Sequence, residues 1–182
     1  MTAYYFLCWV QDGKLQQLIL VAVSAFFATL ARYDGWALFV GVFCCITLVG
    51  WMKHHNWYHI RANLVLFGVL GGLGIVLWFL WNKLIFGDPL YFQKGLYSSQ
   101  AQQSQQLAAG QLYTYHNLWQ AFRFYTIDSV QTIGVILFAL AFVGIAWFVL
   151  KHKFTPVTIA ALLFAIPFPF YMLALYVGQA VI

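Results

Sequence analysis

Residues 62–82 read ANLVLFGVLGGLGIVLWFLWN, an uncharged run of 21 residues that lies between Arg61 and Lys83. A helix that crosses the hydrocarbon core of a bilayer needs about 20 predominantly apolar residues. The strands of a membrane barrel instead alternate polar and apolar residues over about ten positions, whereas this run is continuously apolar. The run therefore predicts a transmembrane helix, and it favours an all-α fold over a barrel for the chain.

The composition extends this interpretation to all 182 residues. Hydrophobic residues make up 64% of the chain and charged residues 7%, whereas soluble domains carry about 25% charged residues. A soluble globule of this size exposes much of its surface to water, and this chain has too few polar side chains to cover that surface. The composition excludes an ordinary cytosolic enzyme, a disordered chain and a nucleic-acid-binding module. It predicts an integral membrane protein that contacts lipids.

Five uncharged stretches predict a polytopic helix bundle that forms a single transmembrane domain over residues 1–182. They are residues 15–31, 35–52, 62–82, 129–150 and 154–182. Residues 2–11 are apolar but too short to span, and they look like the end of a helix whose beginning is absent. Pro167 and Pro169 predict a kink or a break in the fifth span. Gly68 and Gly72, four residues apart, predict close helix packing.

The basic residues predict which segments face the cytoplasm, because Lys and Arg collect at the cytoplasmic ends of spans. They place Lys14, the connection 53–61 and the connection 151–153 on that side. Two segments are then extracytoplasmic, the short turn 32–35 and the long stretch 83–128. A connection longer than about 15 residues is usually functional or disordered, and the many aromatic residues of this stretch argue against disorder throughout.

Three local patterns organise the predicted extracytoplasmic stretch. Gly87, Asp88 and Pro89 predict a turn, because proline fixes its own φ and disfavours helix in the residue before it. Residues 98–109, rich in Gln, Ser and Ala, predict a short exposed helix closed by a glycine, with a flexible linker as the alternative. Residues 117–125 begin with an asparagine suited to an N-cap, and they predict an amphipathic helix at the outer membrane interface.

Two charged side chains stand in the predicted turn between the first two spans. Arg32 and Asp34 lie near the outer surface, where an ion close to lipid needs a partner or a function. They either pair with each other, or they form an anion site in which Arg32 holds a phosphate and Asp34 orients Arg32 or a sugar hydroxyl. Arginine suits phosphate because its planar guanidinium donates two parallel hydrogen bonds.

The long stretch carries further candidate ligands. Asp88 lies on the same predicted side as Arg32, and it either caps its own turn or approaches the Arg32 turn. Lys94 and Arg123 are cations on that side as well, and each is either a solvated interfacial charge or a ligand of the same anion.

His54, His55 and His59 lie in the predicted cytoplasmic connection. His55 and His59 share a helical face at a spacing of four residues, which zinc sites also use. No glutamate stands between them and no further carboxylate is near in the sequence, so they are interpreted as interfacial cations. The sequence predicts no metal site, and it contains no Walker, Rossmann or serine-hydrolase motif.

Several motifs resemble one family of membrane enzymes. The sequence ATLARYDGW at 28–36 resembles the LxRYDGW segment of the GT-C superfamily of integral-membrane glycosyltransferases, among them bacterial relatives of protein mannosyltransferases and lipopolysaccharide sugar transferases. The sequences FGDPLYF at 86–92 and YSSQAQ at 97–102 are similar to a loop of uncharacterised bacterial members. The sequences GQLYT at 110–114 and LYVGQ at 175–179 also fit, so the likeness covers most of the chain.

The resemblance implies a catalytic site on the extracytoplasmic face that takes a sugar from a polyprenyl-phosphate carrier held in the bilayer. It implies donor-side roles for Arg32 and Asp34, and a role for Asp88 and Tyr91 in shaping the outer pocket. No cofactor is implied, because the lipid-linked sugar is the donor substrate. The candidate substrate-binding set is therefore Arg32, Asp34, Asp88, Tyr91, Lys94 and Arg123.

In that family the catalytic carboxylate lies in a first outer loop that this chain lacks. The resemblance therefore implies an internal fragment of a larger enzyme of the bacterial inner membrane, and it names no catalytic base here. Two other interpretations stay open. One is a subunit of a multi-span transporter or flippase, which the proline-containing fifth span favours, and the other is a non-catalytic truncated membrane protein. The sugar, the acceptor, the lipid chain and the oligomeric state are not predicted.

Overall fold

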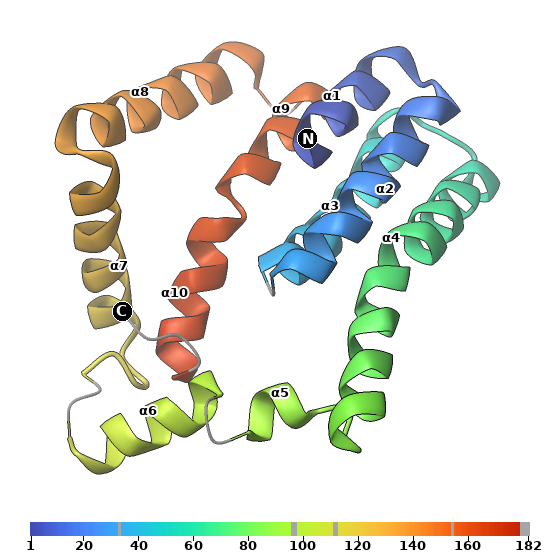
Figure 1. The fold of residues 1–182 in the computed structure, drawn as a ribbon. Coiled ribbons are helices and arrows are strands. Elements are labelled where there is room, and N and C mark those ends of the chain that lie inside the picture. Colours follow the sequence, from blue (N-terminus) through green and yellow to red (C-terminus); the bar gives the residue numbers. More distant parts are fainter. Residues whose placement is uncertain (33, 96–97, 111–112, 154, 179–182) are drawn as a thin grey trace. The chain divides into compact units, whose positions relative to one another are not determined.

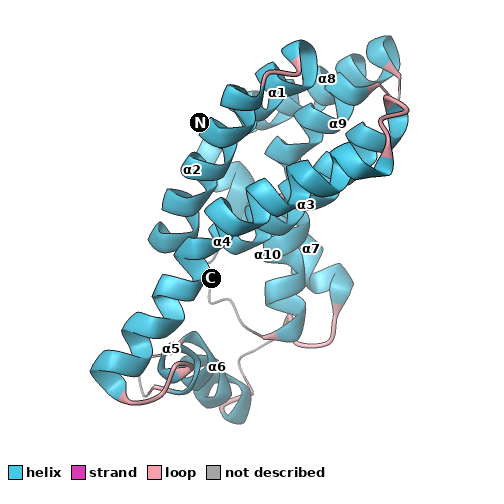
Figure 2. Cartoon of the chain, turned by 90° about the vertical axis from the view of Figure 1, so that its right-hand side faces the viewer, coloured by secondary structure: helices cyan, strands magenta, loops and turns pink. Residues whose placement is uncertain are grey.

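The computed structural model describes residues 1–32, 34–95, 98–110, 113–153 and 155–178. Within these ranges the regular structure consists of ten α-helices and one 3₁₀ helix, with no strand (Figures 1 and 2). The all-α fold class predicted from the sequence is confirmed.

The helices follow the apolar runs, and several of them end at glycine. Gly13 after α1 and Gly134 after α7 have φ of 70° and 90°, a region that glycine enters without steric cost. The elements are α1 (Thr2–Asp12), α2 (Leu15–Ala31), α3 (Asp34–Met52), α4 (Trp57–Phe86), α5 (Tyr91–Lys94), α6 (Ser99–Ala108), α7 (Leu118–Ile133), α8 (Val135–His152), α9 (Pro156–Leu162), η1 (Leu163–Ala165) and α10 (Pro167–Val177).

The chain forms two compact units. Unit 1 comprises Met1–Trp78 and Trp147–Pro167, and unit 2 comprises Phe79–Ala146 and Phe168–Ile182. The helices α4, α8 and α10 each contribute residues to both units. The single transmembrane domain predicted over residues 1–182 stays a prediction.

The core of unit 1 lies among α1, α2, α3 and α9. Both α1 and α3 pack against α2 and against α9 (Figure 1). Phe6 of α1, Leu18 of α2 and Val42 of α3 are completely buried in the cluster that these helices form. The N-terminal helix predicted over residues 2–11 is confirmed as α1, and its apolar residues join this core.

A glycine of α4 allows this helix to approach α2 closely. A Cβ atom on Gly74 would overlap Oγ1 of Thr29 and would lie 2.6 Å from the carbonyl oxygen of Phe26, both on α2. Gly68 and Gly72, the pair predicted as the packing motif, would bring a Cβ only to 3.5 Å from phenylalanine ring atoms, an ordinary van der Waals distance. The closest approach of α4 therefore depends on a glycine outside the predicted pair.

Aromatic side chains hold α7 against α10 in unit 2. The ring of Tyr125 lies 5.1 Å from that of Phe168 and stacks on that of Tyr171 at 5.7 Å, and Phe122 meets Phe168 edge to face at 6.0 Å. Such ring pairs add stability beyond the area that they bury. The helix predicted over residues 117–125 is confirmed as α7, which continues to Ile133 and packs this aromatic face on α10.

Side chains cap the N-termini of the two helices that follow α5. Asn117 Oδ1 accepts a hydrogen bond from the backbone N–H of Gln120 at 3.1 Å, as its predicted N-cap role requires. Ser98 Oγ accepts from the N–H of Ala101 at 3.1 Å at the start of α6, and Gly110, with φ 69°, follows the end of that helix. The short helix predicted over residues 98–109 is therefore confirmed, and the flexible-linker alternative is wrong.

Three helices of the described chain are long and apolar enough to cross a membrane, namely α3, α4 and α8. The broken pair formed by α9 with η1 and by α10 counts as a fourth candidate when it is taken as one span, whereas α2 is a shorter apolar helix of 17 residues. Within the described residues, length and hydropathy thus support three or four candidate spans, and the count of five stays a prediction. The break predicted from Pro167 and Pro169 is confirmed, because α10 begins at Pro167 after the 3₁₀ turn.

The candidate spans keep most of their apolar surface outside the protein core. Within their apolar windows, 28% of residues are buried in α3, 17% in α4 and none in α8. Soluble monomers rarely expose contiguous apolar patches larger than a few hundred Å². The uncovered apolar faces of these helices are typical of an integral membrane protein whose helices contact lipid.

Two predicted boundaries are wrong. The helix predicted as the fourth span begins at Val135 and not at residue 129, because Gly134 ends α7 and separates it from α8. The turn predicted over residues 32–35 is shorter, because α3 already begins at Asp34. Both errors arise because an uncharged run marks apolar residues but does not mark where the backbone leaves the helical conformation.

Candidate functional site

The corner between α2 and α3 carries the two candidate residues of unit 1. Arg32 follows the last residue of α2 in an extended conformation, and its N–H donates to the carbonyl oxygen of Ala28 at 3.2 Å. The N–H of Gly35, in the first turn of α3, donates to the carbonyl oxygen of Arg32 at 3.0 Å. Tyr33 lies outside the described residues. These two hydrogen bonds close a tight corner in which Arg32 and Asp34 are near neighbours.

Arg32 and Asp34 form an ion pair across this corner. The distance between Arg32 Nε and Asp34 Oδ2 is 3.2 Å, and the two side chains are 72% and 32% exposed. An ion pair this exposed contributes only about 0–1 kcal/mol. Asp34 also lies in the first turn of α3, where the helix dipole favours a negative charge. The pairing interpretation is confirmed.

Gly35 and Trp36 fix the corner against α2. A Cβ atom on Gly35 would overlap the carbonyl oxygen of Ala28 and lie 2.7 Å from the backbone nitrogen of Thr29. Trp36 Nε1 donates to the carbonyl oxygen of the buried Thr29 at 3.0 Å. The Asp-Gly-Trp part of the sequence motif therefore has a structural role, which is to hold the charged corner in place at the end of α2.

Asp88 closes the turn between α4 and α5 in unit 2. Its Oδ1 accepts a hydrogen bond from the N–H of Leu90 at 2.8 Å, and its carbonyl oxygen accepts from the N–H of Tyr91 at 3.2 Å. Gly87, just before it, has φ 76°. The turn-capping interpretation of Asp88 is confirmed, so this carboxylate has a structural role whether or not it also binds a ligand.

The remaining candidates also lie in unit 2. The ring of Tyr91 stacks on that of Phe86 at 4.2 Å with an interplanar angle of 9°, which holds it against the end of α4. Lys94 is the last residue of α5. Arg123 is exposed on α7, next to Phe122, which packs on α10. Tyr91 is thus fixed by stacking, whereas Arg123 extends from a helix that is held by its aromatic face.

The structure brings the candidate residues together in two local groups. Arg32 and Asp34 form one group in unit 1, and Asp88 and Tyr91 form another at the α4–α5 turn in unit 2. The convergence of the two groups on one substrate stays a prediction.

A polar pocket in unit 1 has no counterpart among the predicted site residues. It lies beside the connection between α3 and α4, and Lys53, His55 and His59 line it. The only indication of this pocket in the sequence is the close spacing of these basic side chains, which the sequence pattern alone indicates as interfacial cations. Trp9, Gly13 and Leu15 of the lining come from the end of α1 and the start of α2, far away in the sequence, and no local pattern predicts that contact.

Comparisons of the chain with protein-family models, with curated proteins and with solved structures find no match.

Proposed function

We propose that this chain forms part of a membrane glycosyltransferase that transfers a sugar from a polyprenyl-phosphate donor to an acceptor on the extracytoplasmic side. The observation that carries the proposal is the exposed Arg32–Asp34 pair, at 3.2 Å, in a rigid corner beside the candidate span α3. This corner lies within the stretch that resembles the GT-C glycosyltransferases. A corner at the end of an apolar helix lies near the depth of a lipid phosphate, where the donor of such an enzyme carries its charge.

Arg32 is the group that binds the donor phosphate in this proposal. Its side chain is 72% exposed and forms a surface ion pair with Asp34, and pairs of this kind contribute about 0–1 kcal/mol. A phosphate that accepts two parallel hydrogen bonds from the guanidinium binds more strongly than such a pair. Asp34 then orients Arg32, or it accepts a hydrogen bond from a hydroxyl of the sugar.

The reaction is a displacement at the anomeric carbon. The acceptor oxygen forms a bond to that carbon, the bond from the carbon to the phosphate oxygen breaks, and a carboxylate base takes the acceptor proton. The polyprenyl phosphate leaves with the bonding electrons, and Arg32 stabilises the charge that develops on it. No residue of this chain is assigned as the base, so the chain supplies donor binding and leaving-group stabilisation.

Residues of unit 2 have supporting roles. Tyr91, fixed on Phe86, offers a flat aromatic surface beside the Asp88 turn, and such surfaces suit the apolar faces of sugar rings. Lys94 and Arg123 add positive charge on the predicted extracytoplasmic stretch, and this charge attracts an anionic donor.

The proposal is tested by sugar transfer in membranes that contain the full protein. A radiolabelled polyprenyl-phosphate sugar serves as the donor, and Arg32→Ala is compared with Arg32→Lys. We expect Arg32→Ala to lower the rate roughly 10²-fold, the usual cost of removing one group that stabilises charge in the transition state. Arg32→Lys retains the charge but not the two parallel hydrogen bonds. Its transfer rate is therefore expected to lie between those of Arg32→Ala and the unmodified protein.

Lys151→Ala is the matched control, because it removes a cation from the other predicted side of the membrane. This lysine lies over the ring of Trp147 at 4.6 Å, and its loss is expected to leave transfer unchanged. Equal rates for Arg32→Ala and the unmodified protein would contradict the proposal.

A transporter or flippase subunit is the alternative function. The broken pair of α9 and α10 favours it, because discontinuous helices in membranes are tolerated where they line a cavity. Solute uptake by reconstituted vesicles, without any transfer of sugar, would support this alternative and contradict the enzyme.

A further inference from the structure

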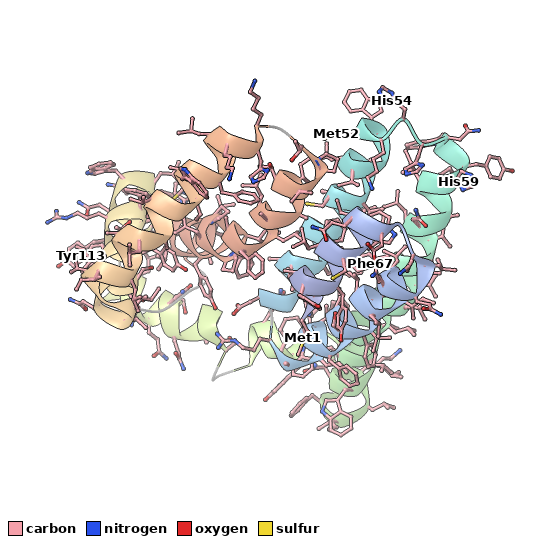
Figure 3. All side chains as sticks on the ribbon, turned by 90° about the horizontal axis from the view of Figure 1, so that it is seen from above. Met1, Met52, His54, His59, Phe67 and Tyr113 are labelled. Carbon is pink, nitrogen blue, oxygen red and sulfur yellow. The ribbon has the colours of Figure 1, made fainter. Side chains whose placement is uncertain are left out.

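A pocket of about 260 Å³ lies in unit 1 between the α1–α2 turn and the connection from α3 to α4. Trp9 and Val49 are its buried lining residues, whereas Lys53, His55 and His59 are exposed. Figure 3 labels His59, on α4, and His54, which lies on the connection between α3 and α4 and does not line the pocket. The complete lining is Trp9, Gly13, Leu15, Val49, Lys53, His55, His59 and Asn63.

The basic side chains of the pocket are hydrogen-bond donors. Lys53 carries an ammonium group, and an imidazole provides at least one N–H in either protonation state. The ammonium of Lys53 also donates to the carbonyl oxygen of Val10 in the last turn of α1, which ties this cation to the α1–α2 side of the pocket. None of the described lining residues is acidic.

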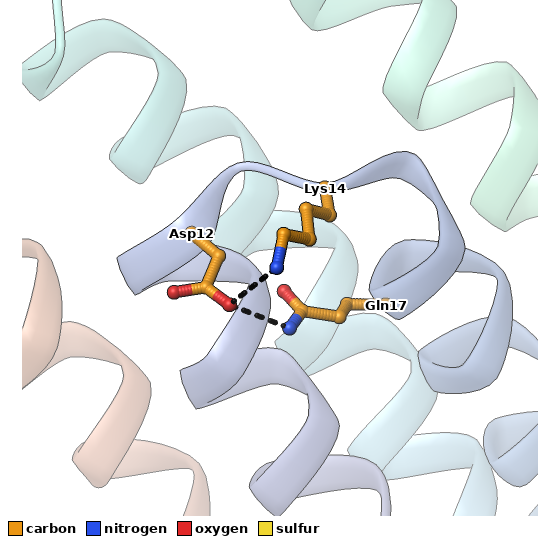
Figure 4. Close-up of polar contacts among 3 residues, drawn as sticks. All are labelled: Asp12, Lys14 and Gln17. Carbon is orange, nitrogen blue, oxygen red and sulfur yellow. Dashed lines mark hydrogen bonds and ion pairs between the residues drawn. The ribbon is translucent and has the colours of Figure 1, made fainter.

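The nearest carboxylate in the α1–α2 turn is already compensated. Asp12 Oδ2 lies 3.6 Å from Lys14 Nζ and accepts a hydrogen bond from Gln17 Nε2 at 3.0 Å (Figure 4). The ammonium group of Lys14 offsets the charge of Asp12 at the flank of the pocket, and the amide of Gln17 gives the carboxylate a hydrogen bond. The basic side chains that line the pocket, Lys53 and the two histidines, therefore contribute positive or hydrogen-bond-donating groups to its electrostatic field.

The N-terminus of α2 adds to this field. Leu15, the first residue of this 17-residue helix, lines the pocket, and its N-cap residue Lys14 makes no side-chain capping hydrogen bond. The first N–H groups of a helix have no partner within the helix, and they carry the positive end of the helix dipole. Together with the three basic side chains, this end of α2 makes the pocket suited to an anion.

A metal ion does not fit the same residues. Zinc in proteins usually has three or four ligands from Cys, His, Asp or Glu, and the pocket offers two histidines. Across the described parts of the chain no group of three such residues is placed to hold a metal. Lys53 would also repel a cation.

The surroundings of the pocket favour a lipid over a free ion. A volume of about 260 Å³ is smaller than the roughly 300–1,000 Å³ of pockets for drug-sized ligands, so it accommodates a headgroup phosphate but not a whole lipid. The neighbouring stripe of α4 lines an apolar groove of about 710 Å³ that begins at Tyr58 and Arg61 and continues through Val65 and Val69. The groove and the pocket have helix α4 in common, since His59 and Asn63 line the pocket and the groove begins at Tyr58 and Arg61. The groove offers an apolar surface to an acyl chain.

We propose that this pocket binds the phosphate of an anionic phospholipid headgroup, whose acyl chain lies along the adjoining groove of α4. Lys53, His55, His59 and the N-terminus of α2 bind the phosphate. The site thereby fixes the α1–α2 turn to the connection between α3 and α4 at the membrane surface.

The test uses the full chain purified in a non-ionic detergent, and isothermal titration with short-chain phosphatidic acid. Phosphatidylcholine of the same chain length and inorganic phosphate are titrated in parallel. We expect phosphatidic acid to bind roughly tenfold more tightly than phosphatidylcholine or inorganic phosphate. Phosphatidylcholine carries a cation in its own headgroup, and inorganic phosphate has no acyl chain. Equal affinity for phosphatidylcholine overturns the proposal, and equal affinity for inorganic phosphate overturns its lipid part.

Substitutions locate the binding. The double variant His55→Ala/His59→Ala is expected to bind phosphatidic acid roughly tenfold more weakly, because it removes two donors to the phosphate. His59→Lys is expected to retain binding, which a merely structural role for His59 would not explain. His54→Asn is the matched control and is expected to bind as the unmodified chain does, since asparagine tolerates the φ of 54° found there. Unchanged binding by the double variant overturns the proposal.

Discussion

At the scale of single residues, Gly35 decides whether the Arg32–Asp34 corner forms. We expect Gly35→Ala to lower the melting temperature in detergent and to cost about 1–3 kcal/mol, because a Cβ there overlaps the carbonyl oxygen of Ala28 and must move α3 away from α2. If the proposed function holds, sugar transfer falls as well, since the partners of Arg32 move with the corner. Thermal unfolding followed by circular dichroism measures the first effect.

Gly144 provides the control for that substitution. It lies within α8, and a Cβ there meets no atom within 4 Å, so Gly144→Ala is expected to be neutral or stabilising by roughly 0.5–1 kcal/mol. Equal melting temperatures for Gly35→Ala and Gly144→Ala would mean that the α2–α3 corner accommodates the added methyl group without loss of stability. The sequence predicted a turn at Gly35, but its close approach to Ala28 depends on how two helices cross, and a single sequence does not encode that angle locally.

At the scale of helices, the contact between α4 and α2 distinguishes two glycines that look alike in the sequence. Gly74→Ala is expected to destabilise the chain by about 1–3 kcal/mol, because its Cβ meets Thr29 and the backbone of α2. Gly72→Ala is the matched control two residues earlier on α4, where the nearest ring atom lies at 3.5 Å. The melting temperatures of the two variants test this contrast. A larger decrease in melting temperature for Gly72→Ala would support the packing pair predicted from the sequence, Gly68 and Gly72.

The N-cap of α7 can be tested independently of any function. Asn117→Ala removes the acceptor for the N–H of Gln120 and is expected to cost about 1 kcal/mol, whereas Asn117→Asp retains a capping oxygen. Hydrogen exchange of the amides at the start of α7 measures the difference. Equal protection in the two variants would show that the packing of Tyr125 on α10, rather than the cap, fixes this end of the helix.

The sequence predicted helices well where composition alone determines them and less well where glycine interrupts them. The caps at Asn117 and Ser98 and the break before Pro167 follow from the chemistry of single residues. The division at Gly134 was not predicted, because the residues on both sides are apolar and uncharged. Counting uncharged runs therefore misplaces the start of α8, since the run beginning at residue 129 joins the last residues of α7 to that helix.

At the scale of the whole molecule, the candidate residues belong to two compact units. Sequence reasoning pairs Arg32 with Asp34 through their proximity in one turn, and the structure confirms that ion pair. The sequence relates this pair to Asp88 only through the number of predicted spans between them. That number predicts whether the residues lie on the same side of the membrane, but it does not predict the distance between them. The same limit explains why the pocket at Lys53 was not predicted, because its lining combines residues that are about 40 positions apart in the chain.

Membrane sidedness is therefore the property of the whole molecule on which the proposed site depends. The candidate spans α3 and α4 separate Arg32 from Asp88, so both residues are expected on one side, and α8 then places Lys153 on the other. After the three native cysteines are replaced by alanine, single cysteines at Arg32→Cys and Asp88→Cys are expected to react with an impermeant thiol reagent on intact cells. His54→Cys and Lys153→Cys should react only after the cells are permeabilised. Labelling of Arg32→Cys and Asp88→Cys from opposite sides of the membrane would contradict a donor site that includes both Arg32 and the Asp88–Tyr91 group.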